Sequence, residues 1–259
     1  MEPVYSSVVS IARAVFAIEG LKFTIHGAEN VPRSGGAVMA INHTGYMDFT
    51  YAGLAARPSG RLVRFMAKDE VFRHRISGPL MRGMHHIPVD RNAGASSFRE
   101  AVTVLKAGEI VGVFPEATIS RSFELKEFKS GTVRMAALAG VPILPTVIWG
   151  SQRVWTKDHP KRLGRSNIPI ILSVGEPITV GRRDDAELAT KQLITRMTEL
   201  LHAAQAEYPP LTGEELKFLP ARLGGTAPTP QEAEVLDAAE AAARAARRAA
   251  RENGTSTGA

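Results

Sequence analysis

The chain has 259 residues, a length that allows one large domain or two small ones. Hydrophobic residues make up 44% of it, enough for a substantial core, and the absence of cysteine excludes disulfides, thiolate nucleophiles and thiolate metal sites. The formal net charge of +6 suggests an anionic partner, such as a phospholipid surface or a phosphorylated substrate. Because aromatic residues are only 6% and no run alternates basic with aromatic residues, nucleic-acid binding is not expected.

Residues 1–20 are expected to form an amphipathic helix. Apolar residues recur there at spacings of four and three, which places on one helical face Val4, Val8, Ile11, Val15 and Ile18. The stretch is too short and too polar to cross a bilayer, and Glu2 and Arg13 do not fit a signal peptide. The apolar face either packs against the protein's own core or lies in a membrane interface.

From residue 21 onward, short apolar runs alternate with amphipathic segments. The runs typical of strands are 21–26, 37–41, 62–67, 86–89, 110–114, 143–148 and 168–174. The segments typical of helices are 47–56, 95–107, 132–139 and 186–206, with short helical pieces between 67 and 86. This alternation predicts an α/β fold, with a mostly parallel central sheet flanked by helices, in a domain that covers residues 21–207.

Residues 208–259 are expected to form a linker and an alanine-rich tail, partly disordered or helical. The first part, 208–230, is rich in proline and glycine. In 231–252 the acidic residues come before the arginines, an order that suits the dipole of a helix. With few large apolar residues, this helix is expected to remain undocked, and its late arginines either face solvent or contact lipid phosphates: Arg244, Arg247, Arg248 and Arg251.

His43 and Asp48 lie five positions apart, in the turn expected after the strand at 37–41. A strand that ends in such a turn would present His43 at the edge of a sheet. Asp48 could then hold one ring nitrogen and leave the other to take a proton from an alcohol, which is the minimum equipment of a general base. A pair with this spacing also arises by chance, as a turn histidine near a helix-capping aspartate.

Three later segments extend the pattern. Arg91 follows the short apolar piece at 86–89. The segment 113–122 leads from a buried strand through Glu116 into hydroxyl groups and Arg121, which together with backbone N–H groups could hold an anion. Residues 141–148 form an apolar strand that is punctuated by prolines.

In this order, the four segments resemble the motifs of the glycerolipid acyltransferase family, and most closely those of bacterial 1-acylglycerol-3-phosphate acyltransferases of the PlsC type. The resemblance covers roughly residues 21–178. The matching positions are Asn42, His43 and Asp48 in the first motif, Arg91 in the second, Phe114, Pro115, Glu116, Thr118 and Ser120 in the third, and the strand at 141–145 in the fourth.

Two positions of the third motif depart from the family pattern. Ala117 stands where the family has glycine, and Ile119 stands where it has the arginine that is taken to bind the phosphate of the acceptor. Arg121, two places further on, can substitute, because side chains two apart in an extended segment point the same way. Otherwise the acceptor is not a simple phosphate monoester.

The resemblance implies an O-acyltransferase that moves a fatty acyl group from acyl-CoA or acyl-carrier protein to the free hydroxyl of a lysophospholipid, most simply 1-acylglycerol-3-phosphate. It makes His43 the general base and Asp48 the residue that fixes its tautomer. The substrate-binding residues expected are Arg91, Glu116, Thr118, Arg121 and, as a further basic candidate, Lys68. No cofactor is expected beyond the thioester co-substrate. A metal site is not expected either, since the adjacent His85 and His86 would point to opposite faces of a strand.

Lysolipids and acyl chains partition into bilayers, so the resemblance implies a peripheral or monotopic protein on the cytoplasmic face of a membrane. Three alternatives remain open: another lysolipid or glycolipid acceptor, hydrolysis of the thioester, or a non-catalytic membrane-surface protein with the same fold. A serine nucleophile is not expected, because Ser120 and Ser122 lack the Gly-x-Ser-x-Gly setting of a hydrolase. The oligomeric state is left open.

Overall fold

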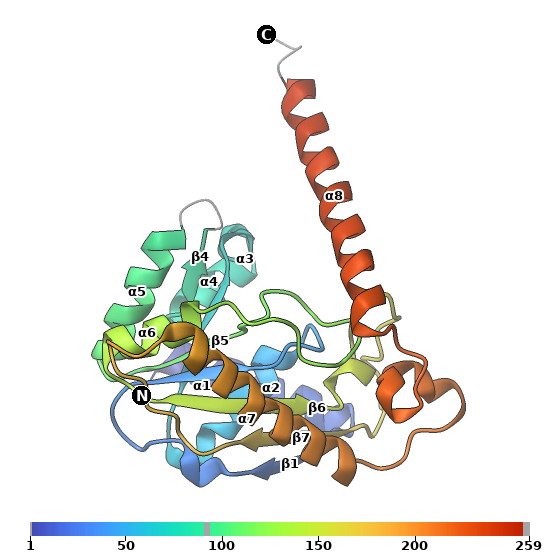
Figure 1. The fold of residues 1–259 in the computed structure, drawn as a ribbon, viewed down its shortest axis with the longest axis horizontal. Coiled ribbons are helices and arrows are strands. Elements are labelled where there is room, and N and C mark those ends of the chain that lie inside the picture. Colours follow the sequence, from blue (N-terminus) through green and yellow to red (C-terminus); the bar gives the residue numbers. More distant parts are fainter. Residues whose placement is uncertain (1, 91–93, 256–259) are drawn as a thin grey trace. The chain divides into compact units, whose positions relative to one another are not determined.

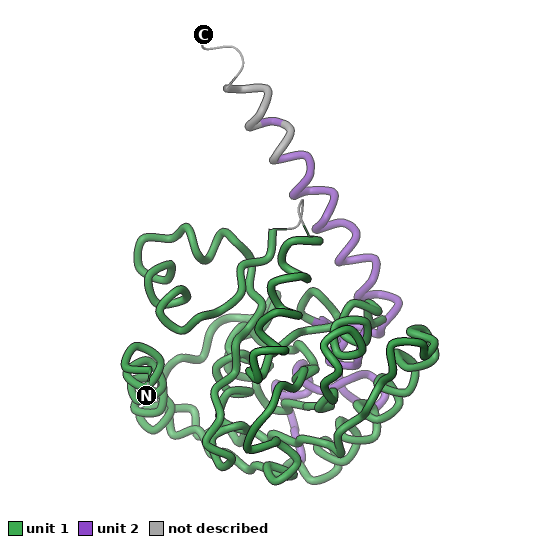
Figure 2. Tube along the Cα trace, turned by 90° about the vertical axis from the view of Figure 1, so that its left-hand side faces the viewer, with its two compact units in different colours: residues 1–119, 127–209 green, residues 120–126, 210–259 purple. Residues whose placement is uncertain are grey.

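The computed structural model of the protein describes residues 2–90 and 94–255. The chain divides into two compact units, which Figure 2 shows in different colours. Unit 1 comprises residues 1–119 and 127–209, and unit 2 comprises residues 120–126 and 210–259.

Unit 1 is built on a seven-stranded sheet with the strand order β1-β7-β6-β2-β5-β3-β4. The strands are β1 (Lys22–His26), β2 (Ala37–Ile41), β3 (Val63–Lys68), β4 (Ile87–Val89), β5 (Ile110–Val113), β6 (Ile143–Trp149) and β7 (Pro169–Val174). Neighbouring strands are parallel except for β6 and β7, which pair antiparallel. The predicted α/β fold with a mostly parallel central sheet is therefore confirmed.

Helices cover both faces of this sheet (Figure 1). One face carries α1 (Pro3–Ile18) and α2 (Asp48–Ala55), and the other carries α5 (Gly94–Lys106), α6 (Gly131–Ala139) and α7 (Ala186–Glu207). Between β3 and β4 lie the short helices α3 (Asp69–Arg73) and α4 (Ser77–Gly83). Single 3₁₀ turns of unit 1 lie at Ala28–Asn30, Arg57–Ser59 and Ser151–Arg153.

The central strands are buried on both faces. Every residue of β2 and β6 is buried, which explains why both read as continuous apolar runs rather than as alternating patterns. Because successive side chains of a strand point to opposite faces, Met39 and Ile41 join Phe16 of α1 and Tyr51 of α2 in one core cluster. The core on this side of the sheet holds α2, and with it Asp48, against the central strands.

Helix α1 forms as predicted, but it packs through other residues than the predicted apolar face. Its buried side chains are Tyr5 and Phe16. Of the predicted face, Val8 packs against neighbouring apolar residues, whereas the remaining four are exposed: Val4, Ile11, Val15 and Ile18. Of the two alternatives for this face, packing against the core therefore does not hold for most of its length, and a membrane interface stays a prediction. None of the described helices is both long and apolar enough to span a bilayer.

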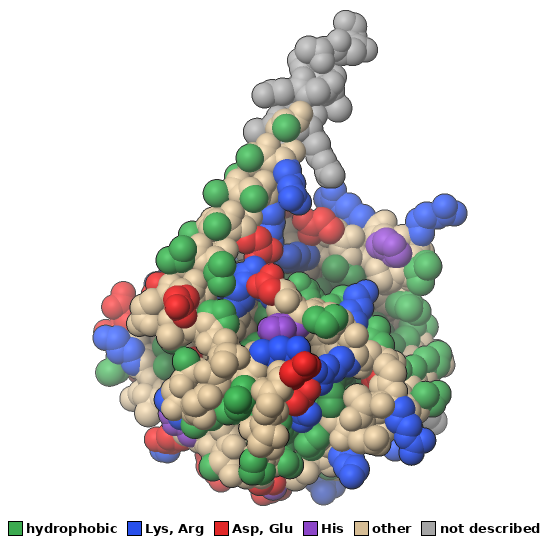
Figure 3. All heavy atoms as spheres, turned by 90° about the vertical axis from the view of Figure 1, so that its right-hand side faces the viewer, with side chains coloured by type: hydrophobic (Ala, Val, Ile, Leu, Met, Phe, Trp, Pro, Cys, Tyr) green, Lys and Arg blue, Asp and Glu red, His purple; other side chains and the backbone are tan. Residues whose placement is uncertain are grey.

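Unit 2 contains α8 (Pro230–Thr255) and two 3₁₀ turns, Gly213–Phe218 and Ala221–Leu223. Helix α8 starts with a reciprocal capping box, in which the Thr229 N–H donates to Glu232 Oε2 (2.8 Å) and the Glu232 N–H donates to Thr229 Oγ1 (3.3 Å). Figure 3 shows the small hydrophobic side chains spaced along this helix. Residues 230–255 are thus helical, where the sequence left helix and disorder open. The expectation that this helix remains undocked is wrong for its first turns, because Asp237 and Glu240 pair with Arg121.

His86 lies in a buried aromatic environment between α1 and β3. Its ring centroid is 5.8 Å from that of Tyr5 and 5.5 Å from that of Phe65, and its Nδ1 accepts a hydrogen bond from the Phe65 N–H (3.1 Å). Burial, and next the positive charge of Arg64, lower the pKa of His86 to about 4, while the charge of Glu2 acts in the opposite direction. The ring is therefore neutral in the folded protein at pH 7, with its hydrogen on Nε2.

We expect this histidine to make the protein acid-sensitive in a defined pH range. An unfolded histidine titrates near pH 6.5, so between pH 6.5 and 4 the unfolded state binds a proton that the folded state does not. The free energy of unfolding should fall across this range by up to about 3 kcal/mol. Urea denaturation at stepped pH measures this, and His86→Asn, which keeps a hydrogen-bond acceptor near Nδ1, should flatten the dependence. The exposed His202→Asn should behave like the wild type, and equal slopes for all three proteins would contradict the assignment.

Candidate active site

Strand β2 lies at the centre of the sheet, between β6 and β5, and His43 follows its carboxyl end by two residues. Ligand sites of parallel α/β sheets gather at the carboxyl ends of such strands. The side chain of Asn42 continues the pairing with β6, because its Nδ2 donates to the Ile148 carbonyl oxygen (3.0 Å) and its Oδ1 accepts from the Ile148 N–H (2.7 Å). An amide side chain thus stands in for a backbone peptide, and the main chain turns away from the sheet at His43.

His43 and Asp48 are joined by a hydrogen bond of 3.0 Å between Nδ1 and Oδ2. The same oxygen accepts the backbone N–H groups of Thr44 and Gly45, both at 2.8 Å. Because these two N–H groups donate to Oδ2, the hydrogen of the His43–Asp48 bond belongs to Nδ1, so in the neutral ring Nε2 carries the lone pair. The Asp48 side chain is fully buried, the His43 side chain is 21% exposed, and Nε2 has no hydrogen-bond partner in the described part of the chain.

The turn between the two residues is held from behind by the segment that follows β6. A Cβ on Gly45 would lie 3.1 Å from the carbonyl oxygens of Ser151 and Trp155, so the close approach favours glycine. Thr44 Oγ1 lies 3.1 Å from Ser151 Oγ, and Thr156 Oγ1 donates to the Thr44 carbonyl oxygen (2.6 Å). Sequence reasoning missed these supporting residues, because they lie more than 100 positions away and form no local motif.

Glu116 joins the third motif to the first. Its Oε1 accepts the backbone N–H of His43 (2.9 Å), and its side chain is buried. Two residues earlier, the Phe114 ring stacks on the His43 ring with a centroid distance of 4.3 Å and an interplanar angle of 29°. The end of β5 therefore fixes both the backbone and the ring plane of His43, a role of Glu116 that the sequence did not reveal.

The rest of the third motif is a tight turn. Ala117 has a φ of 61°, in the left-handed region where glycine, the family residue, carries no steric cost. The Ala117 N–H donates to the Phe114 carbonyl oxygen (3.0 Å), and the N–H of the half-buried Thr118 donates to that of Glu116 (2.8 Å). Ile119 is buried, so the position of the family arginine presents no polar group.

The three remaining predicted substrate residues are Arg121, Lys68 and Arg91. Arg121 belongs to unit 2, where its guanidinium forms ion pairs with Asp237 and Glu240. Lys68 is exposed at the end of β3. Arg91 lies outside the described residues. Within the described ranges, no three histidine, aspartate or glutamate side chains are grouped as metal ligands would be.

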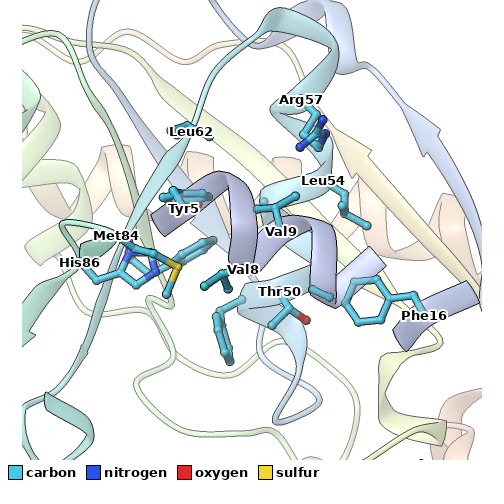
Figure 4. Close-up of a pocket in the computed structure, with 14 residues that line it drawn as sticks. Tyr5, Val8, Val9, Phe16, Thr50, Leu54, Arg57, Leu62, Met84 and His86 are labelled. Carbon is cyan, nitrogen blue, oxygen red and sulfur yellow. The ribbon is translucent and has the colours of Figure 1, made fainter. Parts of the chain in front are cut away.

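A largely apolar pocket lies between α1 and α2 (Figure 4). About 550 Å³ of space lies in it when the open solvent at its mouth is included, and His86 and Arg57 are among its few polar lining residues. Helix α2 begins with Asp48 and turns toward the pocket the four residues that line it from this helix: Phe49, Thr50, Gly53 and Leu54. Helix α2 therefore carries both Asp48, the partner of His43, and part of the lining of the pocket.

Comparisons with known proteins agree with this geometry. The model of a family described as "Acyltransferase" matches residues 22–149. A 1-acyl-sn-glycerol-3-phosphate acyltransferase of Bacillus subtilis is 32% identical over 69% of this chain and 83% of its own length. Its chloroplastic namesake LPAT1 of Arabidopsis thaliana is 30% identical over 58% of this chain and 42% of its own length.

The fold also matches a solved structure, that of the 1-acyl-sn-glycerophosphate acyltransferase PlsC from Thermotoga maritima. The two share 22% sequence identity with a TM-score of 0.62, over 77% of this chain and 78% of that one. The prediction of an O-acyltransferase is confirmed by the relatives, and this chain belongs to the acyltransferase family.

Proposed function

We propose that this protein transfers a fatty acyl group from a thioester, acyl-CoA or acyl-carrier protein, to the free hydroxyl of 1-acylglycerol-3-phosphate, giving phosphatidic acid. The observation that carries this proposal is the 3.0 Å bond between His43 Nδ1 and the buried Asp48, on a ring whose Nε2 has no partner in the described residues. The names of the similar proteins from B. subtilis and A. thaliana support the choice of acceptor.

In the proposed reaction, His43 Nε2 takes the proton of the acceptor hydroxyl as its oxygen attacks the thioester carbonyl carbon. The new C–O bond forms, the C–S bond breaks, and the imidazolium returns the proton to the departing thiolate. Asp48 keeps the proton on Nδ1 and stabilises the transient imidazolium, the role of the acid in serine-hydrolase triads. General-base help of this kind contributes roughly 10²- to 10⁴-fold to the rate.

The precise placement of His43 is proposed to make a second contribution to the rate. Glu116 holds the His43 backbone and Phe114 limits the tilt of the ring. A base fixed in this way loses little freedom when two substrates bind, and holding reactants in the right geometry is worth about 7 kcal/mol or more. We assign Glu116 this positioning role in place of a direct bond to the acceptor.

We further propose that the pocket between α1 and α2 takes an acyl chain. Support comes from its apolar lining and from α2, which carries Asp48 at its first residue and the pocket residues after it. Four further residues are proposed to bind the polar parts of the substrates. Arg121 binds the phosphate of the acceptor in place of the missing family arginine. The remaining polar groups are bound by Lys68, Arg91 and Thr118.

A different acceptor is the second candidate. Ile119 is buried where the family has its phosphate-binding arginine, which favours another lysolipid or a glycolipid. Incubation with labelled palmitoyl-CoA and a panel of lysophospholipids, followed by identification of the products, tests both. A diacyl product identifies the lysolipid that served as acceptor, whereas free fatty acid alone would show that the protein hydrolyses the thioester.

Docking at a membrane surface, on the cytoplasmic face and without a span, is proposed from the substrates and from α1. This helix exposes apolar side chains, with Ile11 at 65% and Ile18 at 74%. A helix with such a face can lie in the interface of a bilayer, and the net charge of +6 favours anionic lipids.

The role of the base is tested by substitution of His43 and Asp48. We expect His43→Ala to lower kcat by about 10²- to 10⁴-fold because no other group takes the hydroxyl proton. Asp48→Asn should also lower kcat strongly, since an amide can donate to Nδ1 and select the wrong tautomer. Circular dichroism checks that both variants are folded, and near-normal turnover by folded His43→Ala would exclude the histidine as base.

The pocket is tested at Gly53. An added Cβ there would meet Phe65 and Tyr5 at 3.9 Å, an ordinary contact, so Gly53→Ala is the control that keeps the pocket open. Gly53→Leu would place an isobutyl group in the pocket. We expect it to shift the ratio of kcat/KM for decanoyl-CoA over palmitoyl-CoA by about tenfold or more, while Gly53→Ala leaves the ratio close to the wild-type value. Unchanged chain-length profiles in both variants would show that the acyl chain lies elsewhere.

Membrane docking is tested by vesicle flotation. The wild type should float with vesicles that contain phosphatidylglycerol more than with pure phosphatidylcholine. The double variant Ile11→Ser/Ile18→Ser should bind both vesicles several-fold less, because it removes exposed apolar surface from α1. Leu188→Ser, which changes a 57% exposed leucine on α7, is the matched control and should bind like the wild type. Equal flotation of all three proteins would rule out α1 as the docking element.

A further inference from the structure

Two cations of unit 2 lie against two carboxylates of α8. Arg121 Nη2 is 3.0 Å from Glu240 Oε2, and Arg121 Nη1 pairs with Asp237 Oδ1. The second oxygen of Asp237 pairs with Lys126 Nζ. The Arg121 side chain is only 8% exposed, so this guanidinium is covered rather than offered to solvent.

The contact uses one face of the first turns of α8. Ala233, Asp237 and Glu240 follow one another at spacings of four and three, which places them on the same side of the helix. These three are less exposed than their neighbours, while residues 241–247 are all exposed. In the part of α8 whose side chains the structure describes, Ala233 is the one buried residue. This face of α8 therefore buries little apolar surface, and its contact with Arg121 and Lys126 is stabilised mainly by the attraction between opposite charges.

The chemistry of this contact is that of phosphate recognition. A guanidinium and an ammonium group together bind the oxygens of an anion, and a phosphate monoester offers three such oxygens with a charge of about −2. Asp237 pairs with both cations, whereas Glu240 pairs with Arg121 through one oxygen and with Arg244 of its own helix through the other. The two carboxylates therefore bind Arg121 with the same kind of charge-assisted hydrogen bonds that a phosphate group would form.

We propose that Asp237 and Glu240 form a carboxylate clasp on Arg121, which the phosphate of the acceptor must displace before Arg121 can bind it. The proposal rests on the proposed function, in which Arg121 holds that phosphate. The clasp lowers the apparent affinity for the acceptor in proportion to the fraction of molecules in which Arg121 is released. Opening of the clasp frees α8 rather than the sheet, because the contact lies within unit 2.

The test compares Asp237→Asn/Glu240→Gln with Glu214→Gln/Glu234→Gln. The second double variant removes the same amount of charge from exposed acidic residues of unit 2. Amide hydrogen exchange of residues 230–241 is followed in the full-length protein, with and without 1-oleoylglycerol-3-phosphate, and the KM for this acceptor is measured with palmitoyl-CoA fixed.

In the wild type and the control, exchange should rise at least about threefold when the acceptor is added. In the clasp variant exchange should be high from the start and insensitive to the acceptor, and the KM should fall at least about threefold. Exchange that does not respond to the acceptor in the wild type would overturn the proposal. A higher KM in the clasp variant would also overturn it, since the carboxylates would then be holding Arg121 ready for binding.

Arg121→Ala separates this proposal from the function on which it rests. A raised acceptor KM in this variant, together with freely exchanging α8, supports both. If the wild type shows no acyl transfer to any lysophospholipid, the proposed function fails, and the exchange response to 1-oleoylglycerol-3-phosphate still decides whether a phosphate ligand opens the clasp.

Discussion

The candidate site depends on one oxygen atom, Oδ2 of Asp48, on which three N–H groups converge. Two of them belong to the backbone of the turn at Thr44 and Gly45, and the third is Nδ1 of His43. Such convergence requires that the turn be tight, that position 45 tolerate close backbone approach, and that the segment after β6 support it from behind. The orientation of the imidazole is therefore a product of packing at the carboxyl ends of the central strands.

The residues proposed to take part in the reaction are held by different interactions in the two units. In unit 1 the backbone and the ring of His43 are held by hydrogen bonds to the buried carboxylates of Glu116 and Asp48. In unit 2 the contact joins the buried Arg121 to the partly exposed carboxylates of Asp237 and Glu240, and salt or a competing anion can weaken it. Hydrogen bonds to buried groups thus lie where a proton is proposed to move, and partly exposed ion pairs lie where a charged headgroup is proposed to bind.

The sequence predicted the sheet and the His43–Asp48 pairing well, because both are local: continuous apolar runs mark buried strands, and the two residues share one turn. It could not predict partners that are distant in the chain. Glu116 meets the His43 backbone across 73 positions, and Arg121 meets α8 across more than 100. The sequence could not decide between the two alternatives for α1 for a related reason, since its spacing defines an apolar stripe without saying whether the core or the surface receives it.

Asn42 has a consequence for the durability of the site. Its amide donates to one group of Ile148 and accepts from another, so it pairs only because its two ends differ. Spontaneous deamidation, the slow hydrolysis that turns asparagine into aspartate in ageing proteins, would set a carboxylate oxygen against the carbonyl oxygen of Ile148. One changed atom would then loosen the end of the strand that leads to His43, so chemical ageing of a single side chain would disturb the candidate site.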